Sequence, residues 1–160
     1  MIEKIIEYLN SLSDVQIIPA YTMYNPPAKP YATYYPLSYD STDHYGAKYR
    51  EGTVEKTDYR IIAQIQFDIF AGGYKEALKK AVDLRELILF NVRRDLHKIN
   101  VGIVNSTGVR GLTEKINDKY DYRASFDVKF EYMKTTKERE IELVKTVDLL
   151  INNRKEKIGG

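Results

Sequence analysis

The sequence contains no cysteine and no tryptophan, and its charges almost balance. Without cysteine, disulfide bonds, zinc–thiolate sites and catalysis by a thiol are all excluded. The chain has 25 lysines and arginines against 23 aspartates and glutamates, a formal net charge of +2. A dedicated nucleic-acid-binding protein normally carries a clear basic excess, so this balance argues against one.

Long apolar runs are also missing. No segment approaches the roughly 20 consecutive apolar residues that a membrane-spanning helix needs. Charges are spread through the first ten residues, which lack the apolar stretch of a secretion signal. We therefore expect no membrane partner, and a protein that folds and assembles in a cytoplasm.

The length of 160 residues, 43% of them hydrophobic and 30% charged, fits one core with a well-solvated surface. We expect a single domain over residues 1–151 and a flexible tail over residues 152–160.

Tyrosine is abundant, with 14 copies, and all 5 prolines lie between residues 19 and 36. A stiff, amphipathic stretch of tyrosine and proline offers a large contact area at low entropic cost, as protein interfaces require. The same composition fits a partly buried loop packed on its own sheet. The sequence leaves both interpretations open.

Hydrophobic periodicity predicts the main elements. Spacing of three and four predicts helices at the amino terminus, ending near residue 13, and over residues 74–91. Strict alternation predicts long half-buried strands over residues 57–70 and 122–132, and shorter apolar runs predict strands at 15–18 and 99–104. Residues 31–37 are β-prone but follow Pro30 and contain Pro36, which predicts an edge position.

Polar composition predicts long loops over residues 38–56 and 105–121, and the glycines at 72 and 73 predict a tight turn. Residues 137–151 fit a strand and a helix equally well, and we favour an extended arm. The predicted class is α+β: a mainly antiparallel sheet with two helices packed on one side, long loops and a C-terminal arm. Mixed charges on the second long strand, at Arg123, Asp127, Lys129 and Glu131, are typical of a solvated face.

No set of residues assembles into a catalytic site. The two histidines are His44 and His97, and a metal site at Asp40, Asp43 and His44 is less favoured than a solvated loop. Gly108, Val109, Arg110 and Gly111 match the four-residue clamp of KH RNA-binding domains, but the preceding strand favours a turn. We expect no catalytic residue, no cofactor and no metal.

Several segments in order carry a family resemblance. They are Pro30-Tyr31-Ala32-Thr33-Tyr34-Tyr35, then residues 60–70 (RIIAQIQFDIF), Glu76-Ala77, residues 100–104 (NVGIV) and residues 122–130 (YRASFDVKF). Their order and spacing resemble the phage neck terminator family, relatives of the tail terminators of long-tailed phages and phage-like particles. The resemblance covers about residues 19–132.

The resemblance implies a structural subunit of the virion tail or neck, assembled in the bacterial cytoplasm, that is not an enzyme. Such proteins form a homo-oligomeric ring, usually a hexamer, on the last ring of the tail tube protein. They stop tube polymerisation and dock the head connector, while DNA only passes through the lumen; the sheath is a further candidate partner. A ring needs two unlike surfaces, and we assign Tyr31, Tyr34, Tyr35 and Arg110 to this interface.

Two alternatives stay open. One is a different head–tail joining or tail-completion protein from the same junction. The other is a small nucleic-acid-binding α+β domain, suggested by the glycine clamp and by tyrosines able to stack on bases. An enzyme ranks below both because no nucleophile, acid, base and binding loop can be named together.

Overall fold

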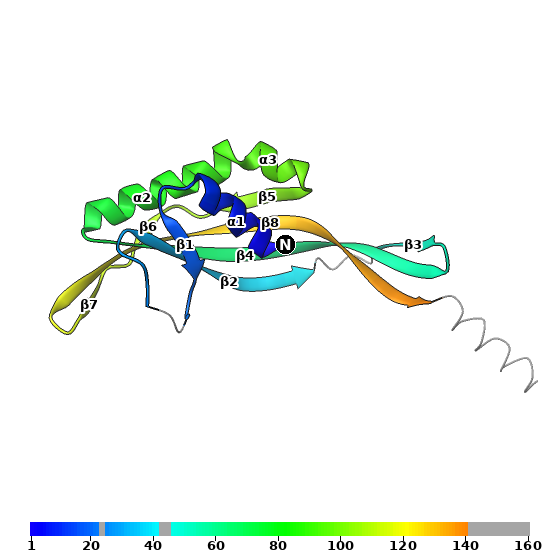
Figure 1. The fold of residues 1–160 in the computed structure, drawn as a ribbon, viewed down its shortest axis with the longest axis horizontal. Coiled ribbons are helices and arrows are strands. Elements are labelled where there is room, and N and C mark those ends of the chain that lie inside the picture. The colour runs from blue at the N-terminus through cyan, green and yellow to red at the C-terminus, as the bar shows by residue number, and fades with distance from the viewer. Residues whose placement is uncertain (23–24, 42–45, 141–160) are drawn as a thin grey trace, which may run out of the picture. The chain divides into compact units, whose positions relative to one another are not determined.

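The computed structural model describes residues 1–22, 25–41 and 46–140. Its architecture is α+β, with a mainly antiparallel sheet and helices on one face, which confirms the predicted fold class (Figure 1). The chain divides into two compact units, the first made of Met1–Asp40 and Ile62–Tyr132, the second of Ser41–Ile61 and Met133–Gly160. The predicted domain over residues 1–151 and the tail over 152–160 stay predictions, since both ranges include residues that are not described.

In the first unit, the amino-terminal helix α1 spans Ile2–Leu12. Its isoleucines and Leu9 recur at helical spacing, and this apolar stripe is buried while the charged residues between are exposed. The short strand β1, Gln16–Pro19, follows and ends at its proline.

The second helical segment is longer than the sequence predicts. It comprises α2 (Tyr74–Glu86), the π-helical turn η1 (Leu87–Asn91) and α3 (Arg93–Lys98). Four of its core residues recur at every fourth position: Leu84, Ile88, Val92 and Leu96.

That spacing explains the π turn. On an α-helix, a spacing of four drifts by about 40° at each step, so a long stripe would rotate away from the core. In η1 the Val92 amide donates to the Leu87 carbonyl at 3.0 Å, a bond that spans five residues. The extra residue in this turn returns Val92 and Leu96 to the buried face. The predicted helix over 74–91 is therefore correct, and its continuation as α3 was missed.

The sheet has the order β1-β2-β4-β8-β5, where β2 is Tyr31–Ser41, β4 is Val54–Ala71, β8 is Lys119–Glu140 and β5 is Val101–Ser106. β1 and β2 are parallel, and β5 is antiparallel to β8. β1 pairs with β2 only as far as Tyr34. The predicted edge position of residues 31–37 is therefore wrong for the start of β2 and fits only its continuation through Pro36.

The two predicted long loops are wrong in large part. β2 extends to Ser41, and β3 (Ala47–Glu51) forms a hairpin with β4, within the second unit, through a turn at Gly52. In the first unit β6 (Arg110–Gly111) and β7 (Glu114–Ile116) pair with β8. All residues of β3, β6 and β7 are exposed, so these strands lack the apolar alternation by which a strand is recognised.

β8 reaches Glu140, so residues 137–140 of the predicted arm are strand. Residues 141–151 lie outside the described part of the chain.

The core of the first unit lies between the helices and one face of β4 and β8. The predicted inward residues Ala63, Ile65, Phe67 and Ile69 of β4 are fully buried, as are Ala124, Phe126, Val128 and Phe130 of β8. At the centre, the rings of Phe67 and Phe126 stack with centroids 5.3 Å apart and planes 19° apart. The alternation in the sequence therefore identified the buried face correctly.

A Phe67→Ala substitution tests this core. Deleting the buried ring should lower the free energy of unfolding by about 3–5 kcal/mol, because a cavity replaces its contacts. Chemical denaturation measures the change. The matched control is Tyr120→Ala, at a ring that is 58% exposed, where a change within about 0.5 kcal/mol is expected. Equal losses at the two positions would contradict the assigned core.

The contact between α1 and α3 predicts a pH dependence. The Tyr8 hydroxyl donates to Asp95 Oδ2 at 2.7 Å, and this bond, followed by the one from Lys98, lowers the pKa of the Asp95 carboxyl. A lowered pKa in the folded state stabilises the fold above the usual aspartate pKa, and this contribution disappears as pH falls through the folded value. Tyr8→Phe should therefore be less stable than the parent near pH 7, and the difference should shrink in acid. Thermal melts of both proteins from pH 7 to pH 3 measure it, and a difference that grows in acid would contradict the assignment.

Candidate assembly surface

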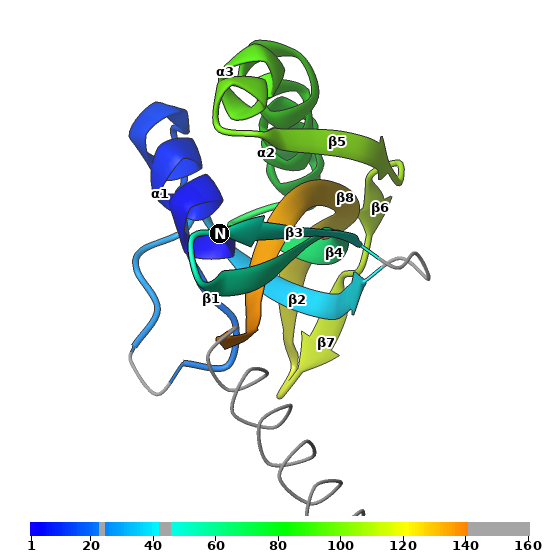
Figure 2. The same cartoon turned by 90° about the vertical axis from the view of Figure 1, so that its right-hand side faces the viewer.

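Within the part of the chain that the structure describes, no helix covers one face of the sheet in the first unit. Figure 2 shows α1, α2 and α3 on the same side of the strands, which leaves the opposite face of β2, β4 and β8 without a helical layer. Even-numbered residues of β4 and odd-numbered residues of β8 belong to this helix-free face. Asp68 and Asp127 are only 8% and 9% exposed, and Ser125 is fully buried. The fully solvated face predicted for β8 is therefore wrong at its centre.

Side-chain hydrogen bonds connect β4 and β6 to β8 across this face, and a further one lies within β4. Asp127 accepts from Gln64 Nε2 at 3.2 Å and from Arg110 at 3.2 Å, and Gln66 Nε2 donates to Asp68 at 3.0 Å. Buried carboxylates need such partners because desolvation without them is costly. The network holds the polar centre of the face in one arrangement.

An aromatic and cationic stack borders the polar centre. The Phe70 ring lies against the Tyr31 ring, with centroids 5.1 Å apart and planes 16° apart. On the same ring, the guanidinium carbon of Arg123 lies 6.0 Å from the centroid, within cation–π range. Arg123 also donates to Glu114 at 3.2 Å, which ties β7 to this border.

Burial of Tyr31 has an electrostatic consequence. Desolvation raises the pKa of its hydroxyl above the usual tyrosine value, and the Asp121 carboxylate raises it further. The Tyr31 hydroxyl therefore stays protonated near neutral pH. Its ring packs between β2 and β4 as an uncharged group.

A groove of about 380 Å³ opens on the helix-free face. Its exposed wall is apolar and aromatic: Tyr21 is 90% exposed, and Tyr35 and Leu37 are each 44% exposed. The rings of Tyr21 and Tyr35 meet edge to face at 5.4 Å and 86°. Its other wall includes Asp68 and Arg123. The groove therefore combines an aromatic rim with a buried carboxylate, Asp68, and a half-buried guanidinium, Arg123, and aromatic residues and arginine are enriched at protein interfaces.

The four residues assigned to an interface from the sequence have different environments. Tyr31 is 9% exposed within its own stack, and Tyr34 is half-buried against the core. Tyr35 lies at the groove rim, and Arg110 is held by Asp127 while its side chain remains 42% exposed. The structure brings Tyr31 and Tyr35 to the helix-free face with Arg110, whereas Tyr34 points to the other face. Their interface role stays a prediction.

The segment with the glycine clamp contains no helix: Gly108 and Val109 lie outside any helix or strand, and a short strand follows them. Arg110 and Gly111 form β6, which pairs with Ser125 and Ala124 of β8. A KH clamp links two helices, so the likeness does not extend to the structure. The Arg110 guanidinium also forms an ion pair with the Asp127 carboxylate.

The candidate chemical groups are few. His97 lies exposed in the last turn of α3, and His44 and Asp43 lie outside the described residues. Across residues 1–22, 25–41 and 46–140, no three His, Asp or Glu side chains gather as a metal site would require.

None of the helices in the described part of the chain is both long and apolar enough to cross a membrane.

The sequence prediction missed three residues of this surface. Tyr21 lies outside any strand, Leu37 lies beyond the proline of β2, and Phe70 is the aromatic residue among the otherwise mostly polar even positions of β4. Of the three, only Phe70 could have been identified from the sequence. An aromatic residue on an otherwise polar strand face indicates a second packing partner on that face. The Tyr21 contact depends on how the chain returns after β1, which periodicity does not encode.

The family model of the phage neck terminator protein matches residues 1–157, almost the entire chain. No curated protein matches the sequence. The family is structural, with a place in the tail and neck of the virion. Because the match extends over far more than half of the sequence, the chain belongs to the phage neck terminator protein family.

Proposed function

We propose that this protein forms a hexameric ring on the end of the phage tail tube, stops the tube from growing and joins it to the head connector. The observation that carries the proposal is the helix-free face of the first unit, with its tyrosine-rimmed groove, in a chain of the neck terminator family. A subunit that ends a filament must bind the filament end through one surface. Once bound, it must not present a site to which the next tube subunit could bind.

The groove suits a protein partner. Its rim tyrosines supply large, rigid contact area, and Asp68 and Arg123 supply polar groups that fix orientation. Both charged side chains are held by Gln66 and Glu114, so little ordering is needed on binding. We assign this groove to the tail tube protein.

Within this proposal, the interface role of Tyr31, Tyr35 and Arg110 is kept in a narrower form, whereas Tyr34 packs against the core of its own subunit. Tyr35 makes direct contact together with Tyr21. Tyr31 and Arg110 hold the surface in shape through Phe70 and Asp127.

The proposal extends to the rest of the assembly. The subunits are made and assembled in the host cytoplasm, DNA passes through the lumen of the ring, and no catalysis or cofactor is involved. A contractile tail would add the sheath as a neighbour.

The test combines a ring assay with a tube-capping assay. Native mass measurement and negative-stain images of the purified full chain should show a ring, and substoichiometric protein should stop growth of purified tail tubes. A double substitution, Tyr21→Ser with Tyr35→Ser, should weaken capping by about tenfold or more while leaving the ring and the melting temperature unchanged.

The control is Tyr120→Ser, which removes a ring that is 58% exposed on the β7–β8 hairpin and should leave capping intact. A chain that stays monomeric with and without tubes would contradict the proposal. Binding to the head connector but never to tube ends would instead assign the protein to another head–tail joining role.

A further inference from the structure

The helical layer carries an exposed aromatic residue flanked by cations. Phe90 in η1 is 71% exposed, and with Arg93, Arg94 and His97 it lines an open hollow of about 460 Å³ beside β5. Glu131 of β8 also lines this hollow, so its two arginines outnumber its one carboxylate. Neither arginine takes part in an ion pair among the residues that the structure describes. We call Phe90, Arg93 and Arg94 the basic knob.

A hollow of opposite character lies between α1 and α2. Its volume is about 250 Å³, and its lining includes Leu12, Leu87, Asp14, Asp83 and Glu86, which we call the acidic groove. Leu12 is 50% exposed, so the floor offers an apolar side chain to a partner. Lys80 pairs with Asp14 at 2.5 Å. Asp83 and Glu86 form no ion pair within the described ranges.

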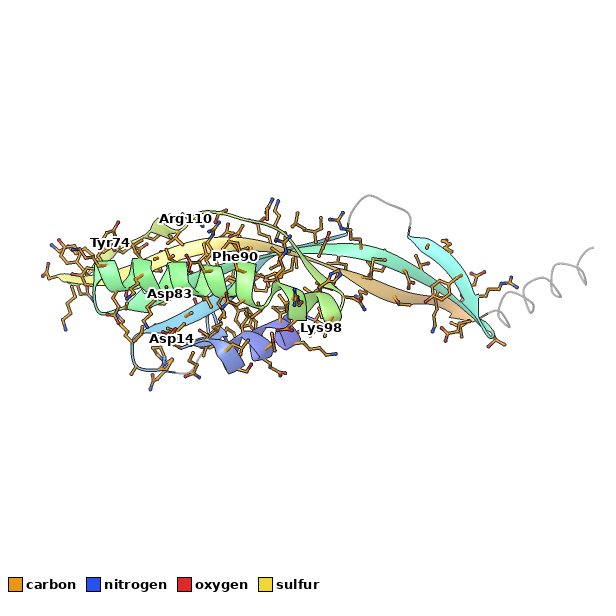
Figure 3. All side chains as sticks on the ribbon, turned by 90° about the horizontal axis from the view of Figure 1, so that it is seen from above. Asp14, Tyr74, Asp83, Phe90, Lys98 and Arg110 are labelled. Atoms are coloured by element: carbon orange, nitrogen blue, oxygen red, sulfur yellow. The ribbon has the colours of Figure 1, made fainter. Side chains whose placement is uncertain are left out.

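The knob and the groove lie on different sides of the same helical segment. In Figure 3, Asp14 and Asp83 lie on the side of α2 that faces α1, and Phe90 lies on the other side. The lining residues agree, because the knob borders β5 and the groove borders α1. One subunit therefore presents both surfaces outward at once.

Charge decides which partner fits. Two knobs facing one another would bring four arginines together, and two grooves would bring carboxylates together, both of which are unfavourable. A knob facing a groove pairs opposite charges around an apolar contact. A head-to-tail contact between unlike surfaces closes into a ring when its rotation allows. With a formal net charge of only +2, the copies do not strongly repel one another.

We infer that Phe90 of one copy inserts into the acidic groove of the next copy. Its ring contacts Leu12 and Leu87, and Arg93 and Arg94 face Asp83 and Glu86. The inference rests on the proposed function, in which copies form a ring, and it identifies the residues that join them. The tyrosine-rimmed groove on the helix-free face stays available for the tube.

The absence of cysteine allows a direct test by cross-linking. Phe90→Cys and Leu12→Cys are made as separate full-length proteins and mixed under mild oxidation, with and without tail tubes. The mixture should give a disulfide-linked dimer, and each variant alone should give at least about tenfold less, since the two positions meet only across unlike surfaces. The control is Lys115→Cys mixed with Leu12→Cys, at an exposed side chain of β7, which should not cross-link.

Charge reversal supplies a second readout. Arg94→Glu should weaken ring assembly by about tenfold or more, and adding Glu86→Arg to the same chain should restore it. Lys98→Glu, on the same helix (Figure 3) but not among the residues that line either hollow, should leave the ring intact. Melting temperatures confirm that every variant is folded.

Other results would overturn the inference. A ring that persists in Arg94→Glu, with no Phe90–Leu12 cross-link, would leave the proposed function standing and refute this contact. Efficient cross-linking of Phe90→Cys with itself would indicate a two-fold contact in place of a head-to-tail one. A strict monomer, with and without tubes, would remove both the contact and the ring.

Discussion

Burial of one face of β4 and β8 beneath the helices is the constraint on which the rest of the first unit depends. Phe67 and Phe126 stack at its centre, and the stripes of α1 and of the α2–η1–α3 segment close over them. Hydrophobic burial is the main favourable term in folding, and no disulfide is available to supplement it. The π turn at Leu87–Asn91 shows how strongly this burial constrains the chain. The helix departs from α geometry at the point where its apolar stripe would otherwise rotate away from the core.

Because one face of the sheet is used for folding, the opposite face carries a different set of side chains. A strand alternates its side chains, so the residues between the buried ones of β4 and β8 must point to the opposite face. There they form a hydrogen-bonded centre around Asp127 and an aromatic border around Phe70. Such a face is too polar to be a second core and too well organised to be only solvated surface. This combination suits the subunit contact that we propose.

Hydrophobic periodicity predicted the helices and strands that contribute buried residues to the core. It missed the strands whose residues are all exposed. The long strands, α1 and the start of the second helix were found because burial imposes a period on their sequences. The strands β3, β6 and β7 were read as loops because every residue in them is exposed, so pairing leaves no mark on hydrophobicity. For β7, the remaining signal in the sequence was its turn. Asn117 and Asp118 both have positive φ in the two-residue hairpin turn between β7 and β8, a conformation for which asparagine and aspartate are favoured.

The sequence alone determined the α+β class, the buried face of each long strand and, through the order of its motifs, the family. Those properties follow from local spacing, which the chain carries along its length. Only the tertiary structure decided which tyrosines are available: Tyr31 is taken into a stack with Phe70, while Tyr35 meets Tyr21 at an open rim. It also decided that Phe90 stands exposed while Ile88 beside it is buried. Exposure of this kind depends on packing between residues distant in the chain, and no local pattern specifies it.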